Sequence, residues 1–242
     1  MTNHEIDQYL DAGAAGMEKP ALNTDRVKAA IVGDLRPVKP LRSRWVFLAG
    51  FSAIFIALCG IGAYRLGPWG WEALSLPRKM LMFGALAASA ALLGSSLVRR
   101  MAPGGRQWAG PALAPTAVFA LLALAIAGVF PFEKDDDFLS AGIICMEAGA
   151  RYAIVAGICF WLLLRRAAWL SPRWEGVATG TLAGLVGVTV LEMHCPLLDA
   201  YHILAWHLGT AALGAASGFL LGMLGEYAQR KSTRNFWRTR AN

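Results

Sequence analysis

The sequence predicts an all-α integral membrane protein: a six-helix transmembrane bundle with a short polar N-terminal cytoplasmic segment. Of its 242 residues, 56% are hydrophobic and 16% are charged, whereas soluble domains carry about 25% charged residues. The apolar residues gather in runs of the length that a spanning helix needs, about 20 residues. No run alternates with period two over about ten residues, which excludes a transmembrane β-barrel. Disulfide-scaffold, collagen-like and fully disordered classes are excluded as well.

The polar segment Met1–Arg44 is too short to bury a core of its own. Thr24 is a suitable N-cap for a short amphipathic helix, which should end at Arg36 because Pro37 disfavours helix in the residue before it. The residues 37–41, Pro-Val-Lys-Pro-Leu, form an extended lead into the membrane. The helix could lie on the membrane surface, dock into a groove of a partner protein, or belong to a disordered tail. Its apolar stripe comprises Val27, Ile31 and Leu35.

Six stretches follow that can span the hydrocarbon core, and a basic tail of residues 228–242 closes the chain. Small residues on their faces indicate a tightly packed bundle, with a dimer face or a ligand path as alternatives. In the last span Gly214, Gly218 and Gly222 share one face. The predicted spans are Trp45–Leu66, Met80–Val98, Ala112–Phe130, Ala141–Leu164, Gly176–Met193 and Ile203–Tyr227.

The distribution of Lys and Arg predicts the orientation, because cytoplasmic loops carry the excess of these residues. Eighteen Lys and Arg lie before the first span, in the links after the second and fourth spans, and in the tail. Four lie on the opposite side. Both termini are therefore expected in the cytoplasm. The sequence pI of about 9.5 then reflects topology and contacts with membrane lipids, and gives no reason to expect direct nucleic-acid binding.

One acid and one base lie inside the fourth span, where ionisable groups are energetically costly. Glu147 and Arg151 are four residues apart, so they share a helix face and can form an ion pair. The pair either locks helix packing or belongs to a proton or ion pathway. A pathway would need further acids at mid-membrane depth, whereas Glu192 lies near the outer end of the fifth span.

Cysteines and histidines cluster toward the outer ends of the predicted spans. The rise of 1.5 Å per residue places Cys145 and His207 at similar depths, roughly 6–9 Å below the outer surface, with Cys195 above them. Thiolate and imidazole together favour Cu(I) or Zn(II), while an oxidising exterior would also permit a disulfide. Chance proximity is the third reading. The candidate residues are Cys59, Cys145, His194, Cys195, His202 and His207, whereas Cys159 lies deeper and should pack as a small hydrophobe.

The chain resembles NrsF-type proteins, which are six-span bacterial inner-membrane anti-sigma factors that restrain an extracytoplasmic-function sigma factor. The resemblance begins in the juxtamembrane stretch 25–41 and continues through Cys145 and Leu162-Leu-Leu-Arg-Arg166. It ends with Leu170-Ser-Pro-Arg173, His194-Cys195-Pro196 and Trp206-His207-Leu-Gly209. It implies a multi-pass protein of the bacterial inner membrane.

The resemblance also implies that sensing and sigma binding belong to different parts of the chain. The paired cysteines of the family correspond to Cys145 and Cys195 and are associated with responses to heavy metals or oxidative stress; His202 and His207 match less closely. The expected protein is a non-enzymatic anti-sigma factor that needs no cofactor. Copper or zinc is its candidate signal, and a sigma factor and a second copy of the chain are its candidate partners. The expected sigma-binding residues are Val27, Ile31, Leu35, Arg36, Pro37 and Leu41.

Two other functions fit parts of the pattern. A membrane oxidoreductase would use disulfide exchange or a haem held by His202 or His207, but the chain has no CxxC motif. A metal or small-molecule transporter would need more intramembrane charges, or repeats with broken helices, than the sequence contains.

Overall fold

The computed structural model describes residue 32 and residues 43–100, 110–133, 137–165 and 171–240. The chain divides into two compact units, Met1–Leu41 and Arg42–Asn242. The first unit lies outside the described residues except for Val32, which is helical and 57% exposed. The expected sigma-binding residues Val27, Ile31, Leu35, Arg36, Pro37 and Leu41 therefore also lie outside the described part of the chain.

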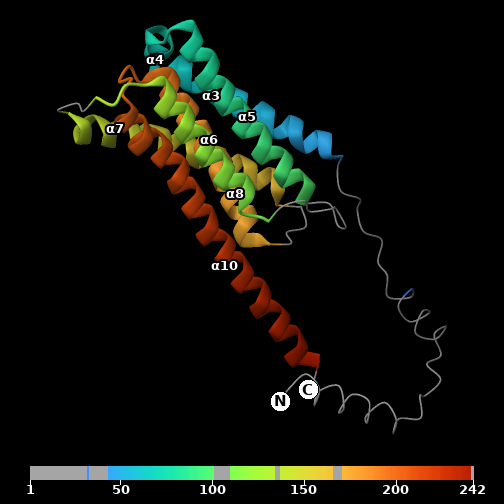
Figure 1. Ribbon diagram of the computed structural model, residues 1–242. Coiled ribbons are helices and arrows are strands. Elements are labelled where there is room, and N and C mark those ends of the chain that lie inside the picture. The colour runs from blue at the N-terminus through green and yellow to red at the C-terminus, as the bar shows by residue number, and fades with distance from the viewer. Residues whose placement is uncertain (1–31, 33–42, 101–109, 134–136, 166–170, 241–242) are drawn as a thin grey trace, which may run out of the picture. The chain divides into compact units, whose positions relative to one another are not determined.

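The described part of the second unit is all helical, as the hydropathy pattern predicts (Figure 1). Five helical stretches are long and apolar enough to cross a membrane: α3, α5, α7, α8 and the run from α9 into α10. Helix α6 is apolar but has only 17 residues, about 26 Å at 1.5 Å per residue. The bounds are α3 Arg44–Leu66, α4 Trp69–Ala73, α5 Leu76–Arg100, α6 Leu113–Val129, α7 Phe138–Leu164, α8 Pro172–His194, α9 Ala200–His202, the π-helical turn η1 Ile203–His207 and α10 Leu208–Arg240.

Helix α8 is the centre of the bundle. Nearly every residue from Ala178 to Glu192 is buried, and α3, α5, α6, α7 and α10 all pack against it. Its sequence is rich in Gly, Ala, Thr and Val on every face, and a helix that is apolar all round is a buried helix. Thr179 and Thr189 satisfy their hydroxyls within the helix by donating to the carbonyls of Glu175 and Leu185. The polar atoms of these threonines therefore do not disturb the core.

Glycines bring α8 and α10 into backbone contact along most of their shared length. A Cβ atom at Gly180 would collide with the carbonyl oxygen of Gly214, and one at Gly218 would collide with that of Gly176. The predicted glycine face of the last span is thus buried against a matching face of the fifth span. Such close approach is how small residues hold helices together in lipid. These two helices pack against each other more extensively than any other pair.

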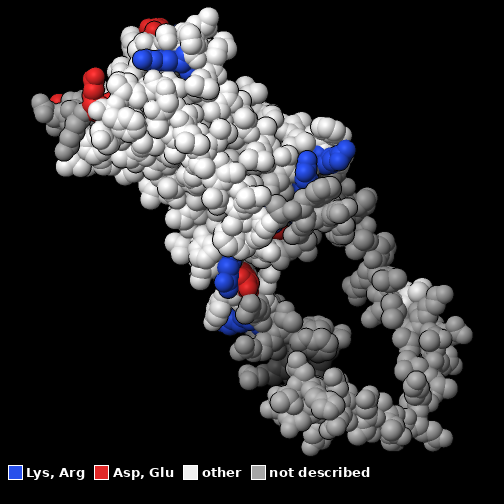
Figure 2. Space-filling model, in the orientation of Figure 1, with Lys and Arg blue, Asp and Glu red and all other residues white. Residues whose placement is uncertain are grey.

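The exterior of the bundle is apolar. Large hydrophobic side chains on α3, α7 and α10 are more than half exposed, among them Ile56, Ile154 and Leu221. On the face shown in Figure 2, the charged side chains gather toward the ends of the described body, and the flank between them carries no Lys, Arg, Asp or Glu. An apolar flank bounded by charged ends is typical of helices that contact lipid.

Candidate functional site

The end of α8 places Cys195 at the edge of the buried core. Pro196 disfavours helix in the residue before it, and Cys195 accordingly takes an extended conformation with φ −76° and ψ 121°. Its backbone N–H still donates to the carbonyl of Leu191 at 2.7 Å and closes the helix. The side chain is only 3% exposed. A thiol therefore points into the protein at the point where the chain leaves the helix.

The next helical run positions two imidazoles beside that thiol. Asp199 caps α9 by accepting a hydrogen bond from the backbone N–H of His202 at 2.7 Å. The chain then makes the π-helical turn η1, which ends at His207. Turns of this kind inside α-helices are frequent at functional sites. Both histidines are 1% exposed, and their ring centroids are 5.2 Å apart.

Helix α7 contributes a second thiol, that of Cys145, to the same region. A Cβ atom at Gly142 would collide with the indole ring of Trp206, so the glycine allows Trp206 to lie directly against α7. Phe138 packs on the same indole, with ring centroids 5.6 Å apart. This contact holds α7 against η1 and brings Cys145, one turn after Gly142, toward the histidines.

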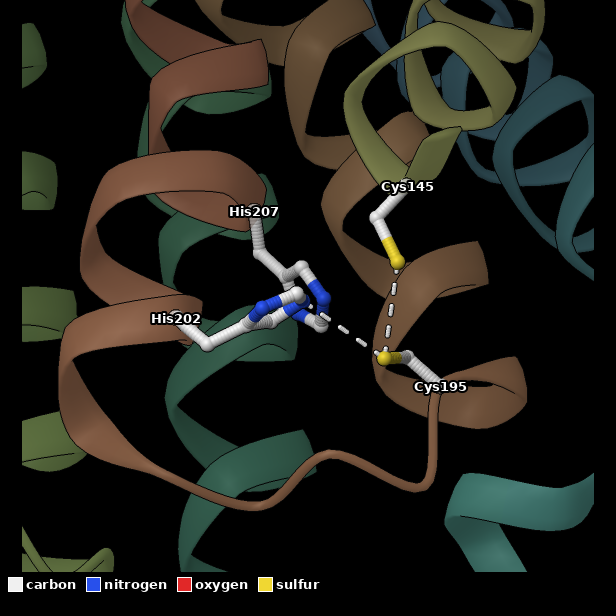
Figure 3. A group of neighbouring side chains, drawn as sticks. All are labelled: Cys145, Cys195, His202 and His207. Atoms are coloured by element: carbon white, nitrogen blue, oxygen red, sulfur yellow. Dashed lines mark hydrogen bonds between the residues drawn. The ribbon is translucent and has the colours of Figure 1, made fainter. Parts of the chain in front are cut away.

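The four side chains Cys145, Cys195, His202 and His207 converge on one point (Figure 3). One donor atom from each lies within 4.8 Å of the donor atoms of the other three. The two sulfur atoms are 3.5 Å apart, and Cys195 Sγ lies 3.7 Å from His202 Nε2. The two cysteines are free thiols. Four of the six candidate residues therefore lie together, as two thiols and two imidazoles.

Glu192 orients one of these imidazoles. His207 Nδ1 donates to Glu192 Oε1 at 2.8 Å, and both side chains are at most 1% exposed. In a neutral imidazole a proton on Nδ1 leaves the lone pair on Nε2. His207 Nε2 is buried and has no hydrogen-bond partner among the described residues. The ring therefore keeps a free donor atom for the cluster.

The Cys195 thiol, which lies beyond the end of α8, favours its neutral form. Its hydrogen bond with Cys145 and its burial raise the pKa of Cys195 above the ordinary value of a thiol. A buried thiol with a raised pKa reacts slowly as a nucleophile. A metal ion would change this balance, because a coordinated thiol loses its proton.

The donor set suits a tetrahedral d¹⁰ ion. Zinc bonds of about 2.3 Å to sulfur and about 2.0–2.1 Å to nitrogen imply separations of roughly 3.3–3.8 Å between donors at the corners of a tetrahedron. The 3.5 Å and 3.7 Å separations at Cys195 already fall in that range. Two cysteines and two histidines are a common ligand set of structural zinc sites. The buried, unpartnered Nε2 of His207 fits the same role.

Two other residues of the predicted cluster lie apart from these four donors. Cys59 is buried on α3, where Thr189 is its hydrogen-bond partner. His194 lies next to Cys195 in the chain, but its Nδ1 faces the carbonyl of Gly67 at 3.3 Å. Neither belongs to the four-residue group found among the described residues.

The short helix α4 covers the loop that carries Cys195. Gly67, with φ +88°, ends α3 in a conformation that favours glycine. A Cβ atom at Gly70 would collide with the carbonyl oxygen of Cys195 and come within 2.7 Å of that of Glu192. Helix α4 is thus pressed against the C-terminal end of α8. Neither α4 nor the pairing of Glu192 with His207 is predicted from the sequence, although an acid three residues before Cys195 is a signal for such a pairing.

Comparison with known proteins adds independent information. The family described as negative regulator of sigma F, NrsF, matches residues 31–224. A protein of Azospira oryzae named probable anti-sigma-F factor NrsF is 31% identical over 228 residues. That alignment covers 92% of this chain and 97% of the relative. No solved structure matches the chain. The family match includes all four residues of the cluster.

Proposed function

This chain belongs to the NrsF family of negative regulators of sigma F, and on that premise we propose that it is a membrane-embedded sensor that restrains an extracytoplasmic-function sigma factor. The cytoplasmic segment before the first span holds the sigma factor. The cluster of Cys145, Cys195, His202 and His207 receives the signal on the other side of the membrane. The protein acts by binding and release and catalyses no reaction.

In this proposal the chain crosses the bacterial inner membrane six times. Five described stretches have the length and hydropathy of spanning helices, and α6 completes the set if the bilayer thins slightly around it or the flanking residues adapt. The outer ends of α3, α7 and α8 meet near the cluster, while the excess of Lys and Arg lies at the opposite ends and in the termini. Both termini are then cytoplasmic.

The proposal that the signal is a metal ion rests on one observation. Four side chains of metal-binding type each offer one donor atom, and these donor atoms lie within 4.8 Å of one another. Sulfur and imidazole together select copper(I), zinc(II) and similar soft or borderline ions over magnesium or calcium. Oxidation is the second candidate signal, because the sulfur atoms of Cys145 and Cys195 are 3.5 Å apart. Hydrogen peroxide would take two electrons and two protons from the two thiols, leaving one disulfide and two molecules of water.

Helices α8 and α10 supply a route from the cluster to the cytoplasmic side. Cys195 follows α8, and His202 and His207 precede α10, so drawing these ligands together acts on both helices. Their glycine faces touch backbone to backbone, and Arg173 Nε donates to Glu226 Oε2 at 2.6 Å near the inner ends. A ligand shifts an equilibrium only if it binds two arrangements differently. We place those two arrangements at the α8–α10 contact.

Co-purification of the sigma factor tests the proposal. Each extracytoplasmic-function sigma factor of the host is expressed with the full-length protein, and membranes are isolated with and without added zinc or copper(I). The proposal expects one sigma factor to remain with the membranes until the metal is added. The variant Cys145→Ser/Cys195→Ser should retain that sigma factor under both conditions.

Two results would contradict the proposal. Absence of every host sigma factor from the membranes would contradict the role of the N-terminal segment. Equal release from the wild type and the double-serine variant would contradict sensing by the cluster, even if a sigma factor is bound.

A further inference from the structure

Helix α7 carries an exposed stripe that no other described part of the chain covers. Six of its side chains, each about one turn from the next, are more than half exposed, and they run along most of the helix. Two of the six are the charged residues Glu147 and Arg151, whose side chains are 61% and 73% exposed. The stripe comprises Ile144 at 68%, Glu147, Arg151, Ile154 at 62%, Ile158 at 55% and Trp161 at 56%.

The spacing of this stripe is that of a helix–helix seam. Successive members are three, four, three, four and three residues apart, which is the heptad pattern with two contact positions per seven residues. Most bundles of membrane helices pack with the same crossing angle as soluble coiled coils. The stripe therefore has the geometry to receive a second helix along its length.

The charged pair within this stripe makes contact with lipid unfavourable. Glu147 and Arg151 form an ion pair along the helix. They lie 9 and 13 residues from Phe138, the first residue of the 27-residue helix, or about 14 and 20 Å along its axis. That depth is near the middle of a spanning helix. Exposed charges at this depth are costly, and such residues normally face a protein interior or pair with other groups.

We propose that the α7 stripe is the interface of a homodimer in the membrane. The inference rests on the membrane placement proposed above. A two-fold axis along the membrane normal brings two parallel copies of α7 together through the same surface. The residues Glu147 and Arg151 are four positions apart, about 6 Å along the helix. An arginine side chain reaches that far, so each Arg151 meets the partner's Glu147 and four charges form one neutral network.

Charge complementarity selects a second copy over another partner. The stripe carries one acid and one base at adjacent contact positions and no other charge, so it complements itself. The cluster residue of α7 lies on another face of the helix: Cys145 is two positions from Glu147, about 200° around the axis. One face of α7 therefore belongs to the metal cluster and the opposite face to the dimer. The dimer can form without blocking the cluster.

Complementation between two charge variants tests the interface. Two full-length copies with different affinity tags are co-expressed, and recovery of one tag through the other is measured from membranes. Arg151→Glu alone gives two acids per stripe, and Glu147→Arg alone gives two bases. We expect each variant to pair with itself at least tenfold less than the wild type. Co-expression of the two variants should restore pairing, because acids then face bases across the interface.

Co-expression of the two variants distinguishes an interface between copies from an ion pair that only stabilises its own helix. Recovery of the mixed pair confirms contact between copies. Failure of the mixed pair to recover, or wild-type pairing of either single variant with itself, overturns the proposal. Insertion is checked in every case from the amount of protein in the membrane fraction. Absence of the wild type from that fraction overturns the membrane placement and with it the dimer, whereas a monomeric wild type in the membrane overturns only the dimer.

Cross-linking at neutral positions covers the case in which the charge variants do not insert. Ile154→Cys places a thiol on the stripe, and Val155→Cys places one at nearly the same depth on a neighbouring face, where Val155 is 46% exposed. A short bis-maleimide should cross-link two copies through residue 154 at least fivefold more than through residue 155 or in the parent protein. Equal cross-linking at both positions overturns the proposal.

Discussion

Glu192 Oε1 lies 2.8 Å from His207 Nδ1 in a part of the core where neither side chain is more than 1% exposed. The two residues come from the end of α8 and from η1. A carboxylate in this position fixes which ring nitrogen carries the proton and how the ring is turned. The proposed metal ligand His207 is therefore oriented before any ion arrives.

Replacement of this carboxylate should weaken metal binding without removing a ligand. Glu192→Gln keeps the shape of the side chain but removes the charge that holds the imidazole. Partners of this kind contribute about 10–100-fold to metal affinity, so we expect zinc affinity to fall by that factor. The measurement is competition between purified protein and a calibrated chelator.

Glu175→Gln is the matched control for that experiment. Glu175 is also buried on α8, at 6% exposure, but it lies 17 residues from Glu192, about 26 Å along the helix. Its replacement should leave zinc affinity within about twofold. Equal losses in the two variants would assign the effect to general disturbance of α8.

Two cysteines on α7 should differ sharply in their contribution to metal binding. Cys145 belongs to the cluster, whereas Cys159 lies 14 residues further along the same helix and outside it. Cys145→Ser should abolish binding at micromolar zinc because a hydroxyl is a poor ligand for a soft ion. Cys159→Ser should bind as the wild type does. Zinc content after dialysis provides the measurement, and loss in both variants would refute the assignment.

The glycine contact between α8 and α10 should be sensitive to a single methyl group. A Cβ atom at Gly214 would collide with the carbonyl oxygen of Gly180, whereas one at Gly209 would meet nothing within 4 Å. We expect Gly214→Ala to lower the free energy of unfolding by about 1–3 kcal/mol, as overpacking does. Gly209→Ala should be neutral or stabilise by up to about 1 kcal/mol, since alanine favours helix.

Thermal unfolding in one detergent compares the two alanine variants on the same helix. Equal stability of Gly214→Ala and Gly209→Ala would show that α8 and α10 do not approach as closely as described.

The N-terminal stripe should bind the sigma factor through its apolar face. Ile31→Asp puts a charge in the centre of the predicted stripe, and loss of such an anchor typically costs at least about 2 kcal/mol, or about 30-fold in affinity. Val32→Asp is the control, because Val32 lies off the stripe and is 57% exposed. The affinity of the sigma factor for a peptide of residues 1–44 is measured for each of the two variants and for the wild type. Equal weakening by the two variants would contradict a defined contact face.

Much of the fold follows from hydropathy, because a helix of about 20 apolar residues makes all of its backbone hydrogen bonds internally in lipid. The apolar stretches that begin at Trp45, Ala141 and Gly176 are all helical, with ends within a few residues of the expected positions. Residue counting along the helices also predicts that Cys145 and His207 lie at the same level of the bundle, and their donor atoms do lie in one group. Depth depends only on rise per residue, so it can be read without knowing the packing.

The lateral arrangement could not be read in the same way. Counting residues does not show that Glu192 faces His207, or that His194 turns away toward Gly67, because both depend on how α8 is rotated against its neighbours. Helix α4 is too short, at five residues, to show a hydrophobic period. The π-helical turn η1 adds a residue to one turn and changes which side chains face inward.

The most direct test follows sigma-dependent transcription in cells that carry the protein in their inner membrane. Zinc or copper(I) is supplied outside the cells, and a sigma-dependent reporter is read with the wild type, Cys145→Ser/Cys195→Ser and Cys159→Ser. Our account predicts strong induction with the wild type and Cys159→Ser and none with the double variant. Full induction with the double variant would contradict sensing by Cys145 and Cys195.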